Sequence, residues 1–221
     1  MKVSTRVALS MLLMVYALGA AAQNAPPRRG KGEFTLQPQF TDSLNVSTGN
    51  GSQAHIEGAL GFGFGLAFNL NNHVSLGGDF FWNQADYKAT VAQDSSANSY
   101  TLTGTLETST IRFNATWNIL ASDFTPFVTG GIGSTYVNTN VPNGPPSNVC
   151  WWDPWWGYYC GTYVPTRSST DLSYTAGLGL RWDVDRSVFL RGMWSRMWID
   201  VGGDLGTPSV DQYRIDLGFK F

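Results

Sequence analysis

The sequence has few charged residues. Lys, Arg, Asp and Glu together make up 14% of its 221 residues, whereas soluble domains average about 25%. This shortage leaves too little charge to cover an ordinary water-facing surface. We therefore expect something other than water to solvate part of the protein.

Other scarcities argue against several functional classes. Only two Cys and two His are present, which leaves little material for a structural metal site, and we expect no cofactor. The net charge is −2, and the basic residues cluster only at 28–31. An extended nucleic-acid-binding surface would need a larger basic patch, so nucleic acid is not an expected partner.

The first 22 residues have the pattern of a secretory signal peptide. Lys2 and Arg6 precede an apolar run over 7–18, and small residues follow at 19–22. An uncleaved membrane anchor is the weaker alternative, because the run is shorter than the ~20 residues that span a bilayer. No later apolar stretch is long enough for a spanning helix, so any spanning would require strands.

The chain beyond the predicted signal peptide alternates with a period of two, as β-strands do. Bulky apolar residues occupy one face and small or charged residues the other, most clearly over 56–70, 111–119, 172–183 and 213–221. Four less regular segments complete a set of eight predicted strands: 34–44, 74–87, 124–137 and 187–201. A soluble barrel or sandwich would normally turn its bulky face inward and its charged face outward.

Short and long connections alternate along the chain. Short links are predicted at 69–72, 121–123 and 183–186, whereas long polar links are predicted at 45–54, 88–104, 138–170 and 202–209. This asymmetry is typical of outer-membrane barrels. We therefore predict an all-β fold, an eight-stranded antiparallel up-and-down transmembrane β-barrel over 34–221, preceded by a periplasmic arm over 23–33.

Aromatic residues separate this prediction from a soluble sandwich or a lipocalin-like barrel, in which they would be core residues. A spanning barrel gathers aromatic residues at both membrane interfaces. Four aromatic residues lie near the predicted short links: Trp117, Phe124, Trp182 and Phe221. Four others lie toward the predicted long links: Trp82, Tyr136, Tyr174 and Trp198.

Three segments resemble strands of the OmpA/OmpX-type outer-membrane β-barrel family: 125–133, 176–181 and 216–221. The resemblance implies location in the cell outer membrane, contact with its lipid and lipopolysaccharide, and a monomer. It also implies that Phe219 and Phe221 form the signal read by the outer-membrane assembly machinery. Strand 187–201 departs from the family pattern, which leaves its facing open.

If the aromatic faces point outward, nine charged residues point into the barrel: Glu57, Asp79, Arg112, Arg181, Asp183, Arg191, Arg214, Asp216 and Lys220. The interior of an eight-stranded barrel is only wide enough for side chains to fill. We expect a paired, hydrogen-bonded network there. The alternative is a narrow, water-filled pore between the glycine-rich walls.

The third long link contains an aromatic segment between two cysteines. Cys150 and Cys160 flank six aromatic residues: Trp151, Trp152, Trp155, Trp156, Tyr158 and Tyr159. We expect a disulfide, because both cysteines lie on the exported side, and a hairpin that pairs the aromatic residues. The hairpin could recognise an extracellular glycan or protein, or it could simply pack over the barrel mouth or among lipopolysaccharide headgroups.

Catalysis is not expected. His73 and Ser75 have a spacing that resembles a lipid A deacylase arrangement, but a short link places them away from the outer leaflet. His55 lies beside Glu57 without a Ser at that spacing. The expected role is structural or cell-surface interaction; a narrow porin-like channel is the alternative, and a lipid A-modifying enzyme is less favoured.

Overall fold

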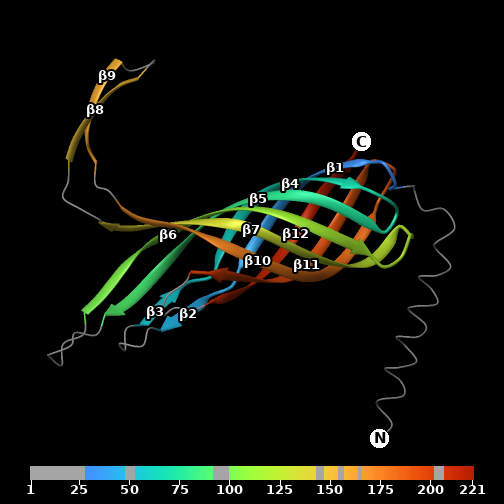
Figure 1. Ribbon diagram of the computed structural model, residues 1–221, viewed down its shortest axis with the longest axis horizontal. Helices are drawn as coiled ribbons and strands as arrows, with labels where there is room; N and C mark the ends of the chain where they lie inside the picture. The colour runs from blue at the N-terminus through green and yellow to red at the C-terminus, as the bar shows by residue number, and fades with distance from the viewer. Residues whose placement is uncertain are drawn as a thin grey trace, which may run out of the picture.

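A computed structural model describes residues 28–47, 53–91, 100–142, 147–153, 157–163, 166–201 and 207–221. Its main body is a closed barrel of eight antiparallel strands (Figure 1), which confirms the predicted fold class. The wall strands are β1 (Gly32–Thr41), β4 (Ala59–Asn69), β5 (Val74–Val91), β6 (Tyr100–Asn118), β7 (Phe124–Pro142), β10 (Thr166–Asp183), β11 (Val188–Asp200) and β12 (Ser209–Lys220). No helix in the described ranges is long and apolar enough to cross a membrane.

The barrel closes between its first and last strands. Each wall strand pairs with the next along the chain, and β1 pairs with β12, so that Phe34 lies opposite Phe219. Closure matters because strands can span lipid only when every backbone polar group has a partner. Within the described wall, closure also pairs the two strands that would otherwise be sheet edges, β1 and β12.

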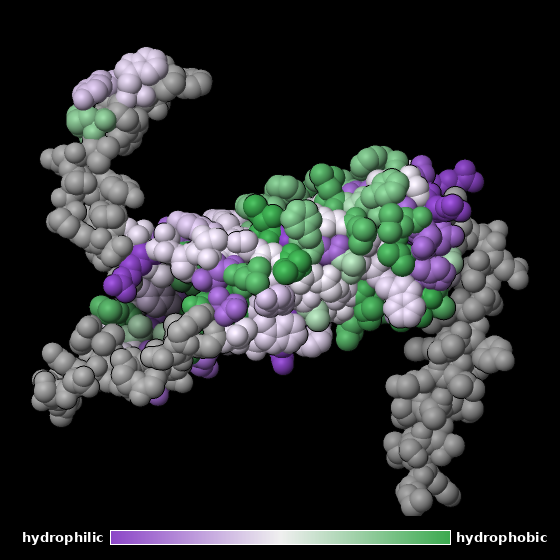
Figure 2. All heavy atoms as spheres, viewed as in Figure 1, coloured by the Kyte–Doolittle hydropathy of each residue, from purple (hydrophilic) through white to green (hydrophobic). Residues whose placement is uncertain are grey.

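The wall is apolar outside and mostly polar inside. In β4, Phe62, Phe64 and Leu66 are exposed, whereas Gly63 and Gly65 between them are buried. Figure 2 shows apolar side chains gathered over the outside of the barrel wall. This is the reverse of a soluble barrel, and it follows directly from the period-two alternation, since successive side chains point to opposite faces.

The small inward residues leave room for larger neighbours. A Cβ built on Gly63 would lie 2.5 Å from the ring of Phe81, and one on Gly65 would lie 2.7 Å from the Gln37 amide nitrogen. Both distances are shorter than van der Waals contact. Glycine at these positions therefore gives space to the side chains that fill the interior.

Short turns gather at one end of the barrel, which we call the short-turn end, and the opposite end is the long-loop end. In the turn over 184–187, the Asp185 carboxylate accepts hydrogen bonds from the backbone N–H groups of Ser187 and Val188, at 2.6 and 2.7 Å. These bonds lower the pKa of Asp185, because they stabilise its charged form. Asn71 holds the turn over 70–73 in the same way.

The strands are longer than predicted at the long-loop end. Residues 88–91 continue β5, and residues 100–104 open β6, although the whole of 88–104 was expected to be a link. Strands β7 and β10 likewise extend into 138–170, which also contains a separate hairpin of β8 (Ser147–Asp153) and β9 (Gly157–Tyr163). Figure 1 shows these paired extensions continuing well past the barrel wall.

A bulge divides the first strand pair. Two short strands, β2 (Leu44–Ser47) and β3 (Gln53–Ile56), continue β1 and β4 beyond a break at 42–43 and 57–58. Across this break, pairing with β5 slips by one residue, from Gly61 opposite Asn83 to Ile56 opposite Tyr87. A one-residue slip exchanges the inner and outer faces of a strand.

The facing of β11, which the sequence left open, follows the same alternation. Arg191, Met193 and Met197 point inward and are buried, whereas Trp194 and Trp198 lie on the outer face. Its outer face thus carries aromatic rings, as the outer faces of β4 and β10 do. The strand therefore belongs to the wall despite its unusual sequence.

Candidate functional site

The barrel interior contains two groups of ion pairs, stacked along the axis. We call Asp79, Arg112, Arg191, Arg214 and Asp216 the central cluster. We call Arg28, Glu33, Arg181, Asp183 and Lys220, at the short-turn end, the basal cluster. All ten side chains are at least nine-tenths buried.

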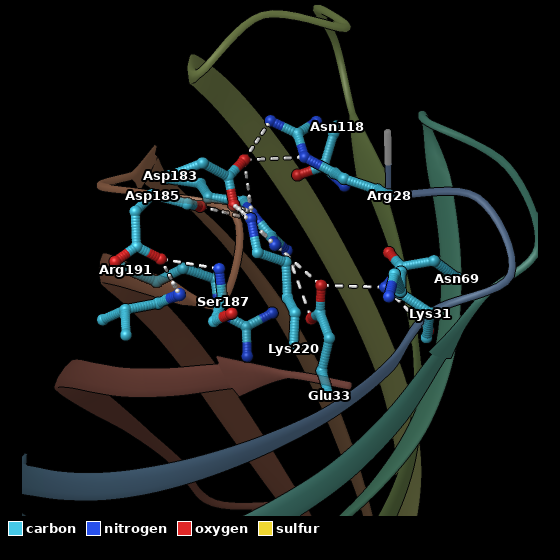
Figure 3. A network of polar contacts seen from close by, with 12 residues as sticks. Arg28, Lys31, Glu33, Asn69, Asn118, Asp183, Asp185, Ser187, Arg191 and Lys220 are labelled. Carbon is cyan, nitrogen blue, oxygen red and sulfur yellow. Dashed lines mark hydrogen bonds and ion pairs between the residues drawn. The ribbon is translucent and has the colours of Figure 1, made fainter. Parts of the chain in front are cut away.

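Arg181 organises the basal cluster. Its guanidinium donates to the Glu33 carboxylate at 2.7 and 3.2 Å, and to Asp183 at 3.0 Å. Lys220 Nζ also donates to Asp183, at 2.8 Å. The residues come from β1, β10 and β12, so these contacts tie together strands far apart in sequence. Figure 3 shows Glu33, Asp183 and Lys220 converging from these strands.

Arg28 closes the short-turn end. Its guanidinium pairs with Asp183 at 2.6 Å and donates to the backbone carbonyls of Asn72, Leu120 and Ser122, at 3.1, 3.2 and 2.6 Å. These carbonyls lie in the β4–β5 and β6–β7 turns, and Asp183 ends β10. One side chain therefore joins two turns and the end of β10 across the short-turn end, and Figure 3 shows Arg28 beside Asp183.

In the central cluster, each carboxylate forms ion pairs with two arginines. Asp79 accepts from Arg112 and Arg214, both at 3.3 Å, and it also accepts from Asn114 at 2.8 Å. Asp216 pairs with Arg191 at 3.0 Å and with Arg214 at 2.8 Å. Arg112 and Asp79 face each other from directly paired positions on β6 and β5.

Aromatic rings lie among the buried cations. Arg181 lies 3.9 Å from the centre of the Phe189 ring, and Arg191 lies 5.1 Å from it. Phe81 lies between Arg112 and Arg214, at 4.9 and 5.2 Å. The two clusters hold six cations against four carboxylates, so the rings and the turn carbonyls help to balance the surplus positive charge.

The structure places eight of the nine predicted interior charges inside the barrel, whereas Glu57 lies at the rim of the long-loop end. Glu57 is exposed in the break before β4. The one-residue slip across this break ends the alternation that would have turned it inward. Ile56 points into the long-loop end instead.

Sequence reasoning missed two basal residues. Glu33 was assigned to the periplasmic arm, but β1 begins at Gly32, and Glu33 shares the inner face with Thr35 and Gln37. Extending the predicted alternation by one residue would have found it. Arg28 precedes the first strand, where no periodicity applies, and so no sequence pattern marks it.

The aromatic hairpin is closed by the expected disulfide. Cys150 and Cys160 are bonded at directly opposite positions of β8 and β9. Trp151 pairs with Tyr159 and Trp152 with Tyr158 in the backbone register. Trp152 and Tyr158 are 68% and 74% exposed, whereas Trp155 and Trp156 lie outside the described residues.

The two histidines have partners of their own. His73 Nδ1 lies 2.9 Å from the backbone oxygen of Asn118, and His55 Nδ1 lies 2.7 Å from Asn45 Oδ1. Ser75 is buried inside the barrel. Within the part of the chain that the structure describes, no three His, Cys, Asp or Glu side chains gather as ligands for a metal ion.

The last strand presents its alternating apolar residues outward. Phe219 and Phe221 are 41% and 68% exposed, while Lys220 between them is buried.

A hollow region occupies the long-loop half of the interior. This cavity, which we call the mouth cavity, has a volume of about 210 Å³. Its lining is mainly apolar: Leu44, Val46, Ile56, Phe81, Trp82, Ala85, Leu106, Val137, Met197, Ile199, Val201, Pro208 and Val210. Arg112 of the central cluster also lines it, so the cavity borders the charged region.

Comparisons with solved structures find other outer-membrane barrels. Ail, the attachment invasion locus protein of Yersinia pestis, solved in complex with the heparin analogue sucrose octasulfate, is 12% identical, with a TM-score of 0.49, over 87% of this chain and 99% of Ail. OprG from Pseudomonas aeruginosa is 12% identical, with a TM-score of 0.47, over 87% of this chain and 96% of OprG.

Sequence comparison is more decisive. No curated protein matches significantly, but the outer membrane protein beta-barrel domain matches residues 8–221. That match covers the whole barrel, including every strand of the closed wall. The chain therefore belongs to the outer membrane protein beta-barrel domain family, and its barrel lies in the cell outer membrane.

Proposed function

We propose that this chain is a non-conducting outer-membrane barrel that presents its long-loop end for binding at the cell surface. In this family of barrels, short turns face the periplasm and long loops face outward. The proposed partners are outer-membrane lipid and lipopolysaccharide around the wall, the assembly machinery at Phe219 and Phe221, and an extracellular glycan or protein at the loops.

The closure of the short-turn end carries the non-conducting part of the proposal. Arg28 bonds to two turns and to Asp183 at the end of β10 across this end, and the two clusters fill the interior behind it. A void among Asp79, Arg112 and Arg214 has a volume of about 10 Å³, which is about the space of one water. Such a void supports a packed interior more than the alternative of a narrow pore.

Planar-bilayer recording tests this closure. The purified protein is expected to give no steady channels, and Arg29→Ala, at an exposed neighbouring position, is the matched control. Arg28→Ala removes the side chain that joins these two turns to the end of β10, and we expect it to raise the frequency of brief openings. Steady conductance from the unchanged protein would favour the porin-like alternative.

The aromatic hairpin is the feature that supports binding at the cell surface, the second part of the proposal. Trp152 and Tyr158 lie opposite each other near its tip, both well exposed, and the disulfide holds their strands in register. Aromatic rings with both an apolar face and a polar edge are enriched at interaction sites. A glycan or a protein surface at the cell exterior is the partner class that this arrangement suits.

Binding of cells bearing the protein to glycan arrays and to host-matrix proteins tests this role. The double change Trp152→Ser and Tyr158→Ser is expected to abolish binding, whereas Trp117→Ser, at the opposite end of the barrel, is expected to preserve it. Heat-modifiable gel mobility verifies that each variant folds. Unchanged binding by the double variant would contradict the recognition role and leave the hairpin a packing element.

The partners of the two histidines support a non-enzymatic role. His73 faces a backbone carbonyl, and Ser75 is buried in the periplasmic half of the interior. A Ser nucleophile needs an adjacent base and access to its substrate. A shortened lipid A acyl pattern in cells expressing the protein, lost on Ser75→Ala, would overturn this part of the proposal.

A further inference from the structure

The mouth cavity has features of a ligand site that the proposed surface role does not use. At about 210 Å³, it exceeds the engineered cavity of about 150 Å³ that stays dry and accepts benzene. Leu106, Val137, Met197 and Val210 supply much of its apolar lining, from four different wall strands. Its size and chemistry suit one small apolar group.

The cavity ends at the central cluster. Phe81 and Arg112 line it, and both are at least nine-tenths buried. Arg112 is already engaged by Asp79 and by the Thr175 hydroxyl, at 3.3 and 3.2 Å. Because its guanidinium is held by these partners, it offers little to an anionic ligand. The site is therefore a blind pocket with a closed floor.

Two carboxylates mark the rim. Asp42 and Glu57 both line the cavity and both are exposed. They lie in the facing breaks of the first strand pair, between Thr41 opposite Ala59 and Leu44 opposite Ile56. Among the described residues that line the mouth cavity, the charged ones are Asp42, Glu57 and the buried Arg112. A ligand that keeps its polar end at the rim would thus meet negative charge.

We propose that the mouth cavity binds a small apolar amine, with its apolar part against Val137, Met197 and Val210 and its cationic head beside Asp42 and Glu57. The rim charge favours a cationic head and disfavours a carboxylate. The occupant comes from outside the cell, because the floor is closed. This binding is independent of the aromatic hairpin, and either can fail without the other.

Methionine methyl groups give a direct readout. Beyond residue 22, Met193 and Met197 are the only methionines in the sequence. Met197 lines the mouth cavity, whereas Met193 lines the small void in the central cluster. Protein labelled with ¹³C at the methionine methyls, in lipid nanodiscs, is titrated with hexylamine, hexan-1-ol and hexanoate, which share one chain and differ in their heads.

We expect hexylamine to shift the Met197 methyl saturably and to leave Met193 in place. It should bind roughly tenfold more tightly than hexanoate, since two carboxylates attract one and repel the other. The double change Asp42→Asn and Glu57→Gln should remove this preference while leaving hexan-1-ol binding unchanged. Hexanoate binding as tightly as hexylamine would overturn the assignment of the head group.

Matched cavity variants test the location. Ala85→Phe fills the cavity from its wall and is expected to abolish the Met197 shift, whereas Ala115→Phe, on the exposed outer face, should retain it. Val210→Phe provides a second filling variant if Ala85→Phe does not fold. Equal shifts at Met193 and Met197, or a shift that both filling variants retain, would overturn the site. Contacts between Met197 and lipid acyl protons without amine would instead make a lipid chain the occupant.

Discussion

The two halves of the barrel interior are built differently. The short-turn half, which the proposed orientation places on the periplasmic side, is filled by buried ion pairs that lock strands and turns together. The long-loop half, on the proposed extracellular side, is lined by apolar side chains and is partly hollow. Both halves have the same wall and the same alternation. The comparison shows that one strand pattern can support a rigid, closed end and a receptive end, depending on which inward residues are charged.

The largest expected effect comes from breaking the basal cluster. Arg181→Met leaves Glu33 buried without its cationic partner and takes one of three cations from Asp183, which should cost about 3–5 kcal/mol of unfolding free energy. Urea unfolding in lipid vesicles measures this loss.

Arg186→Met, at an exposed position in the neighbouring turn, is the control and should change stability by less than about 0.5 kcal/mol. Adding Glu33→Met to Arg181→Met should recover part of the loss, because the unpaired carboxylate is removed. Equal stability of the two single variants would show that the ion pairs do not hold this half together.

Added volume should be poorly tolerated in the periplasmic half. A Cβ on Gly218 would collide with the Phe189 ring, which is fully buried against Arg181. Gly218→Ala is therefore expected to cost about 1–3 kcal/mol, measured by urea unfolding. Since Phe189→Leu should make room, the cost of Gly218→Ala should shrink in that background; an undiminished cost would rule out the steric explanation.

The same kind of change should be mild in the extracellular half. Ala85→Leu adds volume next to the mouth cavity, and it should change the unfolding free energy by less than about 1 kcal/mol. Urea unfolding measures both Ala85→Leu and Gly218→Ala, so the two halves are compared in the same assay. A loss as large as that of Gly218→Ala would show that the extracellular half is packed as tightly as the periplasmic half.

The smallest effect on the barrel is expected from the hairpin disulfide. Cys150→Ser with Cys160→Ser removes a cross-link that is worth roughly 3 kcal/mol to local order by loop-entropy reasoning. The cross-link lies in β8 and β9, outside the wall. Barrel unfolding should be unchanged, while limited proteolysis within 147–163 should accelerate. A shifted barrel transition would mean that the hairpin supports the wall.

The sequence predicts the wall well, because alternation directly encodes facing. Phe62, Phe64 and Leu66 are outside and Asp79 and Arg112 inside, as the period of two requires. Facing is not predicted where the period is interrupted: the bulge before β4 leaves Glu57 exposed at the rim of the mouth cavity instead of buried in the barrel, and this effect depends on pairing with β5. Such a slip depends on how two strands pair, so the sequence of one strand alone does not predict it.

The basal cluster and the mouth cavity show a second limit. Arg28 reaches its backbone partners on two separate turns, and a residue outside any strand has no periodicity to reveal its direction. The cavity forms from side chains on strands far apart in the sequence, and no local pattern specifies a void. Strand lengths at the long-loop end were also underestimated, because polar strands such as 88–91 have no apolar face to mark them.

The central claim is that the periplasmic half is closed and the extracellular half is open to small molecules. Single cysteines at Ala85 and Thr116, in a chain with Cys150→Ser and Cys160→Ser, test it by reaction with a charged, water-soluble methanethiosulfonate. Ala85 lines the mouth cavity, and Thr116 is buried near the short turns. The account predicts rapid labelling of Ala85→Cys and labelling of Thr116→Cys only after unfolding; comparable rates in the folded barrel would contradict it.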